Sequence, residues 1–399
     1  MIKLSSNAIS YLFMITYIIS YITRINYGAV LVEMVAATEF SKSALSVALT
    51  ASFVTYGVGQ IISGFIGDRF QPKQLVFGGL ALSTLMNIAI PFCKNPLIMA
   101  ICWSVNGFAQ AMIWPPMVRL MVFLFKDDEY RKASVKVSYG SALGTISVFL
   151  MAPFLISVWG WKSVFLTSAF LGFLMIFVWQ FFCPEIDVEP NAVSKDRKVC
   201  ATASAFKIDL LFVFIMVAIV LQGALRDGVT TWTPTYIDDM FGLGSALAIF
   251  TSVVLPIFSM CCHGFSGWLY YRVFKNPPFL AGVMFGVGAL AAAVLYFVGG
   301  GSAVASVLCL AILVGAMHGV NLMLICMLPS FYKNTGKVSL VSGLLNSCTY
   351  VGSAVSTYGI ALLTEGVGWS VTVGMWSIVA LLGAVFSFVS TVLWNKKHF

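Results

Sequence analysis

The stretch AISYLFMITYIISYITRINYGAVLVEM, residues 8–34, decides the class of fold. It is long enough to cross a bilayer as a helix, which takes about 20 mostly apolar residues, yet it contains Arg24. A second apolar stretch, residues 207–240, contains Arg226 in the same way. An arginine at the centre of a membrane helix costs about 2.5–3.5 kcal/mol on insertion scales. We therefore expect both arginines to bind an anion that is not part of the protein.

The composition of the whole chain agrees with that interpretation. Hydrophobic residues make up 60% of it and charged residues 10%, whereas soluble domains carry about 25% charged residues. The sequence predicts an all-α membrane protein with twelve transmembrane helices in two pseudo-symmetric six-helix bundles. The expected spans are residues 8–34, 43–67, 74–93, 97–125, 132–158, 162–183, 207–240, 246–270, 278–299, 302–331, 337–364 and 368–394. We expect no cleavable signal peptide, because the first apolar run is too long for one and contains Arg24.

The longest polar stretch divides the chain into two halves. Residues 185–206 are rich in charged and small polar side chains and predict a cytoplasmic linker. We expect one six-helix bundle over residues 1–184 and another over residues 207–399.

The two halves also carry matching motifs. Three pairs recur at a spacing of about 200 residues, which argues for internal duplication. The pairs are GFIG at 64–67 with GFSG at 264–267, Gly160-Trp161 with Gly368-Trp369, and Arg24 with Arg226. Repeated halves with a substrate site at the bilayer midplane are how many secondary transporters are built.

Basic residues are distributed unevenly between the two sets of loops. Only Lys42, Lys94 and Lys162 fall on one side if the N-terminus is placed inside. The other side has Lys3, Arg69, Lys73, Lys126, Arg131, Lys132, Lys195, Arg197, Lys198, Lys207, Arg272, Lys275, Lys333, Lys337, Lys396 and Lys397. This asymmetry predicts cytoplasmic termini in the plasma (bacterial inner) membrane. It also explains the net charge of +8 without a nucleic-acid partner.

The motif search argues against an enzyme. The nine cysteines are scattered without CxxC spacing, so we expect packing residues and neither a disulfide framework nor a metal site. There is no phosphate-binding GxxxxGK[ST] loop, His/Cys ligand cluster or nucleophile elbow. We expect no cofactor.

Polar side chains form stripes along several expected spans. Thr16, Ser20, Arg24 and Tyr27 share one helical face, and Gln222, Arg226, Thr230 and Thr233 share another. The candidate substrate-binding residues are Arg24, Arg226, Tyr27, Gln60, Gln110, Trp114, Gln222, His318, Asn321, Asn346 and Tyr350. For a single uncharged residue, a hydrogen bond between helices is the more common role. For the arginines we favour function, because the planar guanidinium can hold a carboxylate or phosphate by two parallel hydrogen bonds.

The acidic residues leave open where a proton would be carried. Asp227 is the local counter-ion for Arg226, but neighbouring helical residues point about 100° apart, so we expect the two on different faces. Asp227 and Glu33 are the candidate proton carriers. Asp68 and Arg69, in a charged turn after Gly67, and Arg119 are expected to serve gating or structure. His263 is expected to be a core residue.

At this point the motifs resemble the major facilitator superfamily, through the twelve spans, the linker and the segment GFIGDR at 64–69. Two further segments resemble its organophosphate:phosphate antiporters: QAMIWPPMVR at 110–119 and LRDGVTTWTPTY at 225–236. The resemblance implies that Arg24 and Arg226 bind a phosphoryl group during alternating access, and that Tyr350 matches the family's tyrosine of the eleventh span. The partners implied are an organic anion, inorganic phosphate and the bilayer, and we expect a monomer.

The chain departs from glycerol-3-phosphate transporters at basic positions. Ile25 and Gln60 stand where those proteins have lysine, and the region 139–141 has no histidine, although Lys136 lies in the same span. These differences argue against glycerol 3-phosphate as the specific substrate and leave a bulkier or singly charged organic anion open. Exchange for phosphate is the first hypothesis. A proton- or sodium-coupled symporter using Asp227, Glu33 or His318 is the second, and a sugar-phosphate sensor that does not transport is the third.

The charge asymmetry generates a topology prediction. In a cysteine-free background, Lys195→Cys should resist an impermeant thiol reagent in intact cells and react after permeabilisation, because residues 185–206 are expected inside. Lys94→Cys, on the opposite side, is the control that should react in intact cells. Labelling of position 195 from outside would contradict the topology.

Overall fold

The structure is a computed structural model that describes residues 5–40, 42–186, 208–243, 251, 253–298 and 300–398. All regular elements within these ranges are helices. The chain forms two compact units, the first of residues 1–206 with 329–347 and the second of residues 207–328 with 348–399. The domain boundaries predicted from sequence stay a prediction, and residues 187–206 of the expected linker lie outside the described residues.

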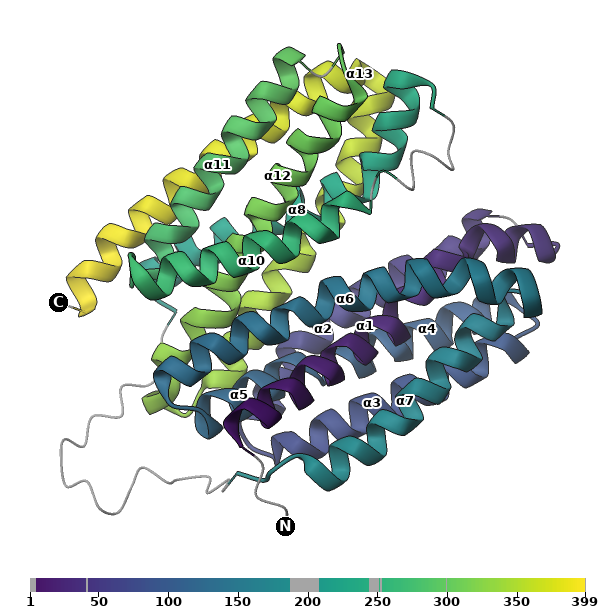
Figure 1. The fold of residues 1–399 in the computed structure, drawn as a ribbon, viewed down its shortest axis with the longest axis horizontal. Coiled ribbons are helices and arrows are strands. Elements are labelled where there is room, and N and C mark those ends of the chain that lie inside the picture. The colour runs from purple at the N-terminus through teal and green to yellow at the C-terminus, as the bar shows by residue number, and fades with distance from the viewer. Residues whose placement is uncertain are drawn as a thin grey trace. The chain divides into compact units, whose positions relative to one another are not determined.

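The first unit is built from helices that pack side by side in several pairs. Helix α1 packs on α6 and α7, α2 on α4, and α3 on α4 and α7 (Figure 1). Its elements are α1 (Ser6–Ala37), α2 (Lys42–Gly67), α3 (Pro72–Ala89), η1 (Ile90–Phe92), α4 (Pro96–Ala111), α5 (Trp114–Leu124), α6 (Asp127–Trp159) and α7 (Lys162–Phe182). Helices α4 and α5 make up one expected span, interrupted before Pro115 and Pro116. Proline lacks the N–H that a continuous helix needs, so it begins α5 and does not extend α4.

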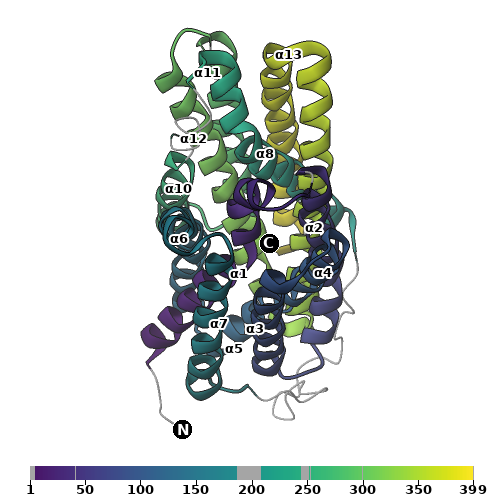
Figure 2. The same cartoon turned by 90° about the vertical axis from the view of Figure 1, so that its right-hand side faces the viewer.

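The second unit places α10, α11 and α12 side by side, with α12 also packed on α8 (Figures 1 and 2). Its elements are α8 (Leu210–Phe241), α10 (Val254–Arg272), α11 (Pro277–Val298), α12 (Ala303–Asn321) and the π-helical turn η2 (Leu322–Met327). The 3₁₀ segment η3 (Leu328–Thr335) and helix α13 (Val338–His398) each contain residues of both units. Non-helical backbone at Gly368 divides α13 into two spans.

Eleven helical stretches within the described residues are long and apolar enough to cross a membrane. The expected span 246–270 begins outside the described residues, and most of its remainder forms α10. Large apolar side chains lie on the outside of the units, where Phe297 is 83% and Phe181 is 74% exposed. Such surfaces suit contact with hydrocarbon, and the helices satisfy their own backbone hydrogen bonds there. The all-α membrane fold is therefore confirmed.

The two Gly-Trp pairs that indicated a duplication have the same backbone conformation. Gly160 has φ 74° and ψ 172°, and Gly368 has φ 81° and ψ 177°. Glycine reaches this region readily because it has no Cβ. Trp161 then packs on Phe165, and Trp369 packs on Tyr236, so each pair ends one span and anchors the next.

Helices α8 and α13 approach at backbone distance within the second unit. A Cβ added to Gly223 would lie 2.1 Å from the carbonyl oxygen of Thr349, and one added to Gly352 would lie 1.9 Å from that of Val220. Small residues let membrane helices approach this closely, where van der Waals contacts and interhelical hydrogen bonds hold them together. The contact fixes Ser353 of α13 against α8.

This contact generates a stability prediction. Gly352→Ala should lower the free energy of unfolding by about 1–3 kcal/mol, because the methyl group forces the two backbones apart. The measurement is the melting temperature of the purified protein in detergent. Gly286→Ala is the control, since a Cβ there meets nothing within 4 Å and alanine favours the helix. Equal melting temperatures for the two variants would contradict the prediction.

Candidate functional site

Arg24 lies among aromatic rings in the first unit. Its guanidinium carbon is 4.1 Å from the ring centroid of Tyr21 on the same helix and 4.9 Å from that of Tyr56 on α2. A guanidinium over an aromatic face is stabilised by the ring quadrupole, by about 2 kcal/mol or more when desolvated. The rings compensate the charge without supplying an oxyanion.

The aromatic cluster continues from Tyr21 to Trp114. The ring centroid of Tyr17 lies 5.0 Å from that of Tyr21 and 4.9 Å from that of Trp114. Trp114 is only 3% exposed, and its indole Nε1 has no hydrogen-bond partner among the described residues. An indole N–H can only donate. We call Arg24, Tyr17, Tyr21, Tyr56 and Trp114 the Arg24 cluster.

Gln60 and Asn346, both predicted to bind substrate, bond to each other in the first unit. The Asn346 amide donates to Gln60 Oε1 at 2.9 Å, and Gln60 Nε2 donates to the carbonyl of Ala111 at 3.4 Å. Gln60 is completely buried. The structure therefore brings these two residues together, and their role toward substrate stays a prediction.

Gln110 belongs to a buried network that links α1, α3 and α4. Its Nε2 donates to Thr23 Oγ1 at 2.9 Å and to Ser83 Oγ at 2.7 Å. Ser83 in turn donates to Asn106 Oδ1 at 2.7 Å. Asn26 and Asn87 extend the network, with a 2.7 Å bond between their amides. Both amide hydrogens of Gln110 are occupied by these bonds, which is the interhelical role weighed for single polar residues.

Tyr27 lies in the aromatic core of the first unit. Its ring centroid is 5.0 Å from that of Trp103 and 5.9 Å from that of Phe165, and its hydroxyl donates to the carbonyl of Leu45 at 3.2 Å. The side chain is fully buried. Periodicity placed it on a polar stripe but could not identify Trp103 and Phe165 as its neighbours, and its role toward substrate stays a prediction.

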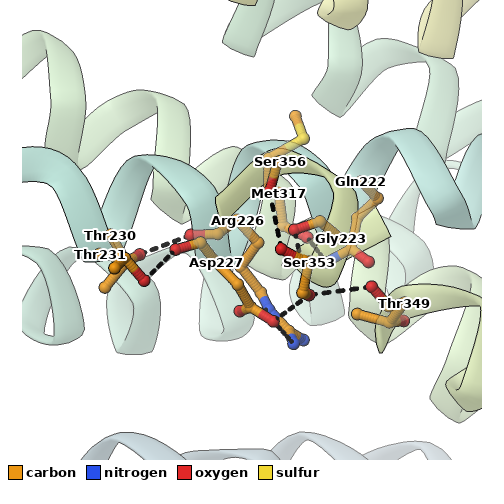
Figure 3. A network of polar contacts seen from close by, with 10 residues as sticks. All are labelled: Gln222, Gly223, Arg226, Asp227, Thr230, Thr231, Met317, Thr349, Ser353 and Ser356. Carbon is orange, nitrogen blue, oxygen red and sulfur yellow. Dashed lines mark hydrogen bonds and ion pairs between the residues drawn. The ribbon is translucent and has the colours of Figure 1, made fainter. Parts of the chain in front are cut away.

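Arg226 forms a two-bond ion pair with the residue that follows it (Figure 3). Arg226 Nε lies 2.6 Å from Asp227 Oδ1, and Nη2 lies 2.9 Å from Oδ2. Asp227 is therefore the counter-ion of Arg226, as predicted, and the charged ends meet although neighbouring helical residues point about 100° apart. The arginine side chain is long enough for its guanidinium to reach the carboxylate of the residue that follows it.

Ser353 completes this group from α13. Its hydroxyl contacts Asp227 Oδ2 and lies 2.9 Å from the carbonyl oxygen of Thr349 (Figure 3). Gln222, one turn before Arg226, donates to the carbonyl of Met317 at 3.1 Å, and its Oε1 has no partner among the described residues. Sequence reasoning missed Ser353, although its position beside Gly352 was the available signal. We call Arg226, Asp227 and Ser353 the Arg226 group.

The remaining candidates in the second unit lie on α10, α12 and α13. The rings of His318 and His263 have centroids 5.2 Å apart, and His263 Nδ1 lies 2.9 Å from the carbonyl oxygen of Ser259. His263 is buried, as expected of a core residue. Asn321 and Tyr350 are half-buried. In the first unit Glu33 is exposed near the end of α1.

The predicted gating residues meet at the start of α13, within the first unit. Asp68 Oδ1 accepts from the backbone N–H of Ser339 at 2.9 Å, and Oδ2 accepts from that of Leu340 at 3.0 Å. A carboxylate suits the unpaired N–H groups and positive dipole end of a helix N-terminus. Arg119 donates to the carbonyl of Gly67, while the exposed Arg69 stacks on Phe65.

Burial raises the pKa of the Asp68 carboxyl. The two backbone hydrogen bonds and the positive charges of Arg119 and Lys337 act in the opposite direction. Burial is the largest of these effects, so protonation begins at a higher pH than for a free aspartate. The described residues contain no group of three His, Cys, Asp or Glu side chains that could hold a metal ion.

Comparison with known proteins agrees with this architecture. The chain is 26% identical over 308 residues to the glycerol-3-phosphate transporter of Bacillus subtilis (strain 168), covering 69% of this chain and 67% of that protein. It is 26% identical over 155 residues to a probable hexose phosphate transport protein of Chlamydia pneumoniae, covering 39% of this chain but only 34% of that protein. The fold matches the solved structure of the proton:xylose symporter XylE with a TM-score of 0.77, at 9% identity, over 98% of this chain and 95% of that one.

A sequence profile of the Major Facilitator Superfamily matches residues 13–357, which is most of the chain. The helical spans, the duplicated motifs and the fold similarity all agree with that match. The chain belongs to the Major Facilitator Superfamily of membrane transporters.

Proposed function

We propose that this transporter moves a phosphorylated or related organic anion across the membrane by alternating access, in exchange for inorganic phosphate. The observation that carries the proposal is a guanidinium at a corresponding place in the first membrane span of each unit, Arg24 in the first and Arg226 in the second. Arg24 is compensated by aromatic faces and Arg226 by a carboxylate fork. The similarity to a glycerol-3-phosphate transporter supports the same class of substrate.

The Arg24 cluster supports anion binding in particular. Aromatic faces stabilise the positive charge of a guanidinium, and a guanidinium binds carboxylate or phosphate through its N–H groups. The indole N–H of Trp114, buried without an acceptor among the described residues, adds a further donor in the same cluster. Leaving a buried donor unsatisfied costs about 1–3 kcal/mol, which a bound oxygen would recover.

The charge of these residues favours a singly charged anion. Ile25 and Gln60 bring no charge to the spans that contain them, and Asp227 neutralises Arg226. Lys136 contacts Asn7 and the ring of Tyr11 near the start of α1. The smaller number of basic residues in these spans suits a monoanionic ester better than a dianion.

Exchange is tested by counterflow in proteoliposomes. A carrier with an arginine in its anion site should reorient slowly when empty, because a positive charge without bound anion would cross a low-dielectric barrier. Vesicles preloaded with phosphate should therefore take up labelled glycerol 3-phosphate or hexose phosphate faster than empty vesicles. Equal rates in both, with stimulation by a proton gradient, would favour the symporter, and saturable binding without any uptake would favour the sensor.

The arginine fork generates a second prediction. Arg24→Lys and Arg226→Lys keep the charge but lose the two-bond geometry, so each should weaken anion binding about ten- to hundredfold. Alanine at either position should abolish transport while the protein still inserts. The measurement is equilibrium binding of labelled phosphate to purified protein.

Arg131→Lys is the matched control. Arg131 pairs with Asp128 at 3.5 Å in a partly exposed position at the start of α6, where a lysine can replace it. Near-normal binding by both the Arg24 and the Arg226 variants would remove the proposed function.

A further inference from the structure

We propose that Asp227 competes with the transported anion for Arg226, and that the anion binds together with one proton, which Asp227 takes up. The inference rests on the proposed function and adds the coupling chemistry of one of its residues. It holds for exchange and for symport alike, because it concerns the binding step.

The paired N–H donors of Arg226 are occupied by a carboxylate within the protein. Asp227 already accepts from Arg226 Nε and Nη2, the donor edge that gives parallel bonds to a carboxylate or phosphate. An oxyanion can take this edge only if the Asp227 carboxylate leaves it. Asp227 is therefore an internal analogue of the substrate's charged end.

The second step is the fate of the displaced carboxylate. The Arg226 side chain is 10% exposed and that of Asp227 is 31% exposed, within a membrane span. A carboxylate without its cation, next to a second anion, is strongly disfavoured there. Protonation removes the charge, and the partial exposure of Asp227 gives solvent access for the proton.

The third step is the position of the neutral acid. Ser353 Oγ contacts Asp227 Oδ2 and lies 2.9 Å from the carbonyl oxygen of Thr349. The hydroxyl can donate to Asp227 when the carboxylate is charged. When Asp227 is protonated, the hydroxyl can donate to Thr349 and accept the new proton. Every group then has a partner in both states, and no covalent bond other than O–H forms.

Other titratable groups surround this one on the neighbouring helices. His318 of α12 and His263 of α10 both lie within electrostatic range of Arg226. Tyr350 lies one turn before Ser353 on α13. These groups could also respond to pH, so the test must separate Asp227 from them.

The experiment measures binding of labelled inorganic phosphate and glycerol 3-phosphate to the purified full-length protein from about pH 6 to about pH 8, across the range in which phosphate groups titrate. Asp227→Asn, which mimics the neutral acid, should bind about ten- to hundredfold more tightly than the wild type at the upper pH. The two affinities should converge as the pH falls. Over the pH range in which Asp227 releases its proton, the affinity of the wild type should fall with rising pH more steeply than that of the variant. The extra loss should be about tenfold per pH unit. Titration of the phosphate group of the probe changes the affinity of both proteins equally, so it does not affect the comparison between them.

Two variants sharpen the comparison. Asp239→Asn makes the same chemical change at an exposed position of α8 and should behave as the wild type. Ser353→Ala removes the hydroxyl that donates to the charged carboxylate more strongly than it accepts from the neutral acid, so it should move the wild-type pH dependence to higher pH. A gain of affinity in Asp227→Asn cannot come from misfolding.

Each result bears on a definite claim. Equal pH dependence in the wild type and Asp227→Asn, or weaker binding by Asp227→Asn at every pH, overturns the inference and leaves the proposed function standing. If Asp227→Asn does not fold, Ser353→Ala takes its place. The same pH dependence of binding in Ser353→Ala as in the wild type would then overturn the inference and leave the proposed function standing. Absence of binding of either probe to wild type and variants alike overturns the proposed function, and the inference with it.

Discussion

The positive charge of a guanidinium inside a bilayer must be compensated. The rest of the structure depends on how this chain meets that requirement at Arg24 and at Arg226. Arg24 is held between tyrosine rings in one unit, and Arg226 is held by a carboxylate in the other. The two solutions differ in their consequences. Tyrosine rings contact the guanidinium of Arg24, whereas the Asp227 carboxylate occupies the Nε and Nη2 edge of Arg226. The repeated arginines are therefore not equivalent, although they occupy matching positions in the duplicated sequence.

Close helix packing positions the partners of these charges. Gly223 and Gly352 bring α8 and α13 to backbone distance, which places Ser353 on Asp227. In the first unit a Cβ on Gly343 would lie 2.2 Å from the carbonyl oxygen of Gln60, beside the bond from Asn346 to the same glutamine. Small residues thus allow polar side chains of different helices to satisfy one another where water is absent. The same packing places the N-terminus of α13 on Asp68.

Much of this architecture could be predicted from sequence, because membrane spans require long apolar runs and charges within them are conspicuous. The all-α fold, the two arginines and the break at each Gly-Trp pair follow from such patterns. The partners of polar side chains could not be predicted in the same way. Periodicity gives the face of a helix but not the neighbour it meets, so it identified neither the network of Gln110 nor the rings around Tyr27. The Arg226–Asp227 pair was predicted, but not its two-bond geometry, because Cβ directions say little about the end of a long, flexible side chain.

The central claim is that negative charge on the substrate is what the buried arginines recognise. A ligand that binds only the folded protein raises its melting temperature by mass action. The most direct measurement is therefore the melting temperature of the purified protein with a sugar phosphate and with the same sugar lacking its phosphate. Stabilisation by the phosphorylated compound alone is the predicted result. Equal stabilisation by both, or stabilisation by the neutral sugar alone, would contradict the account.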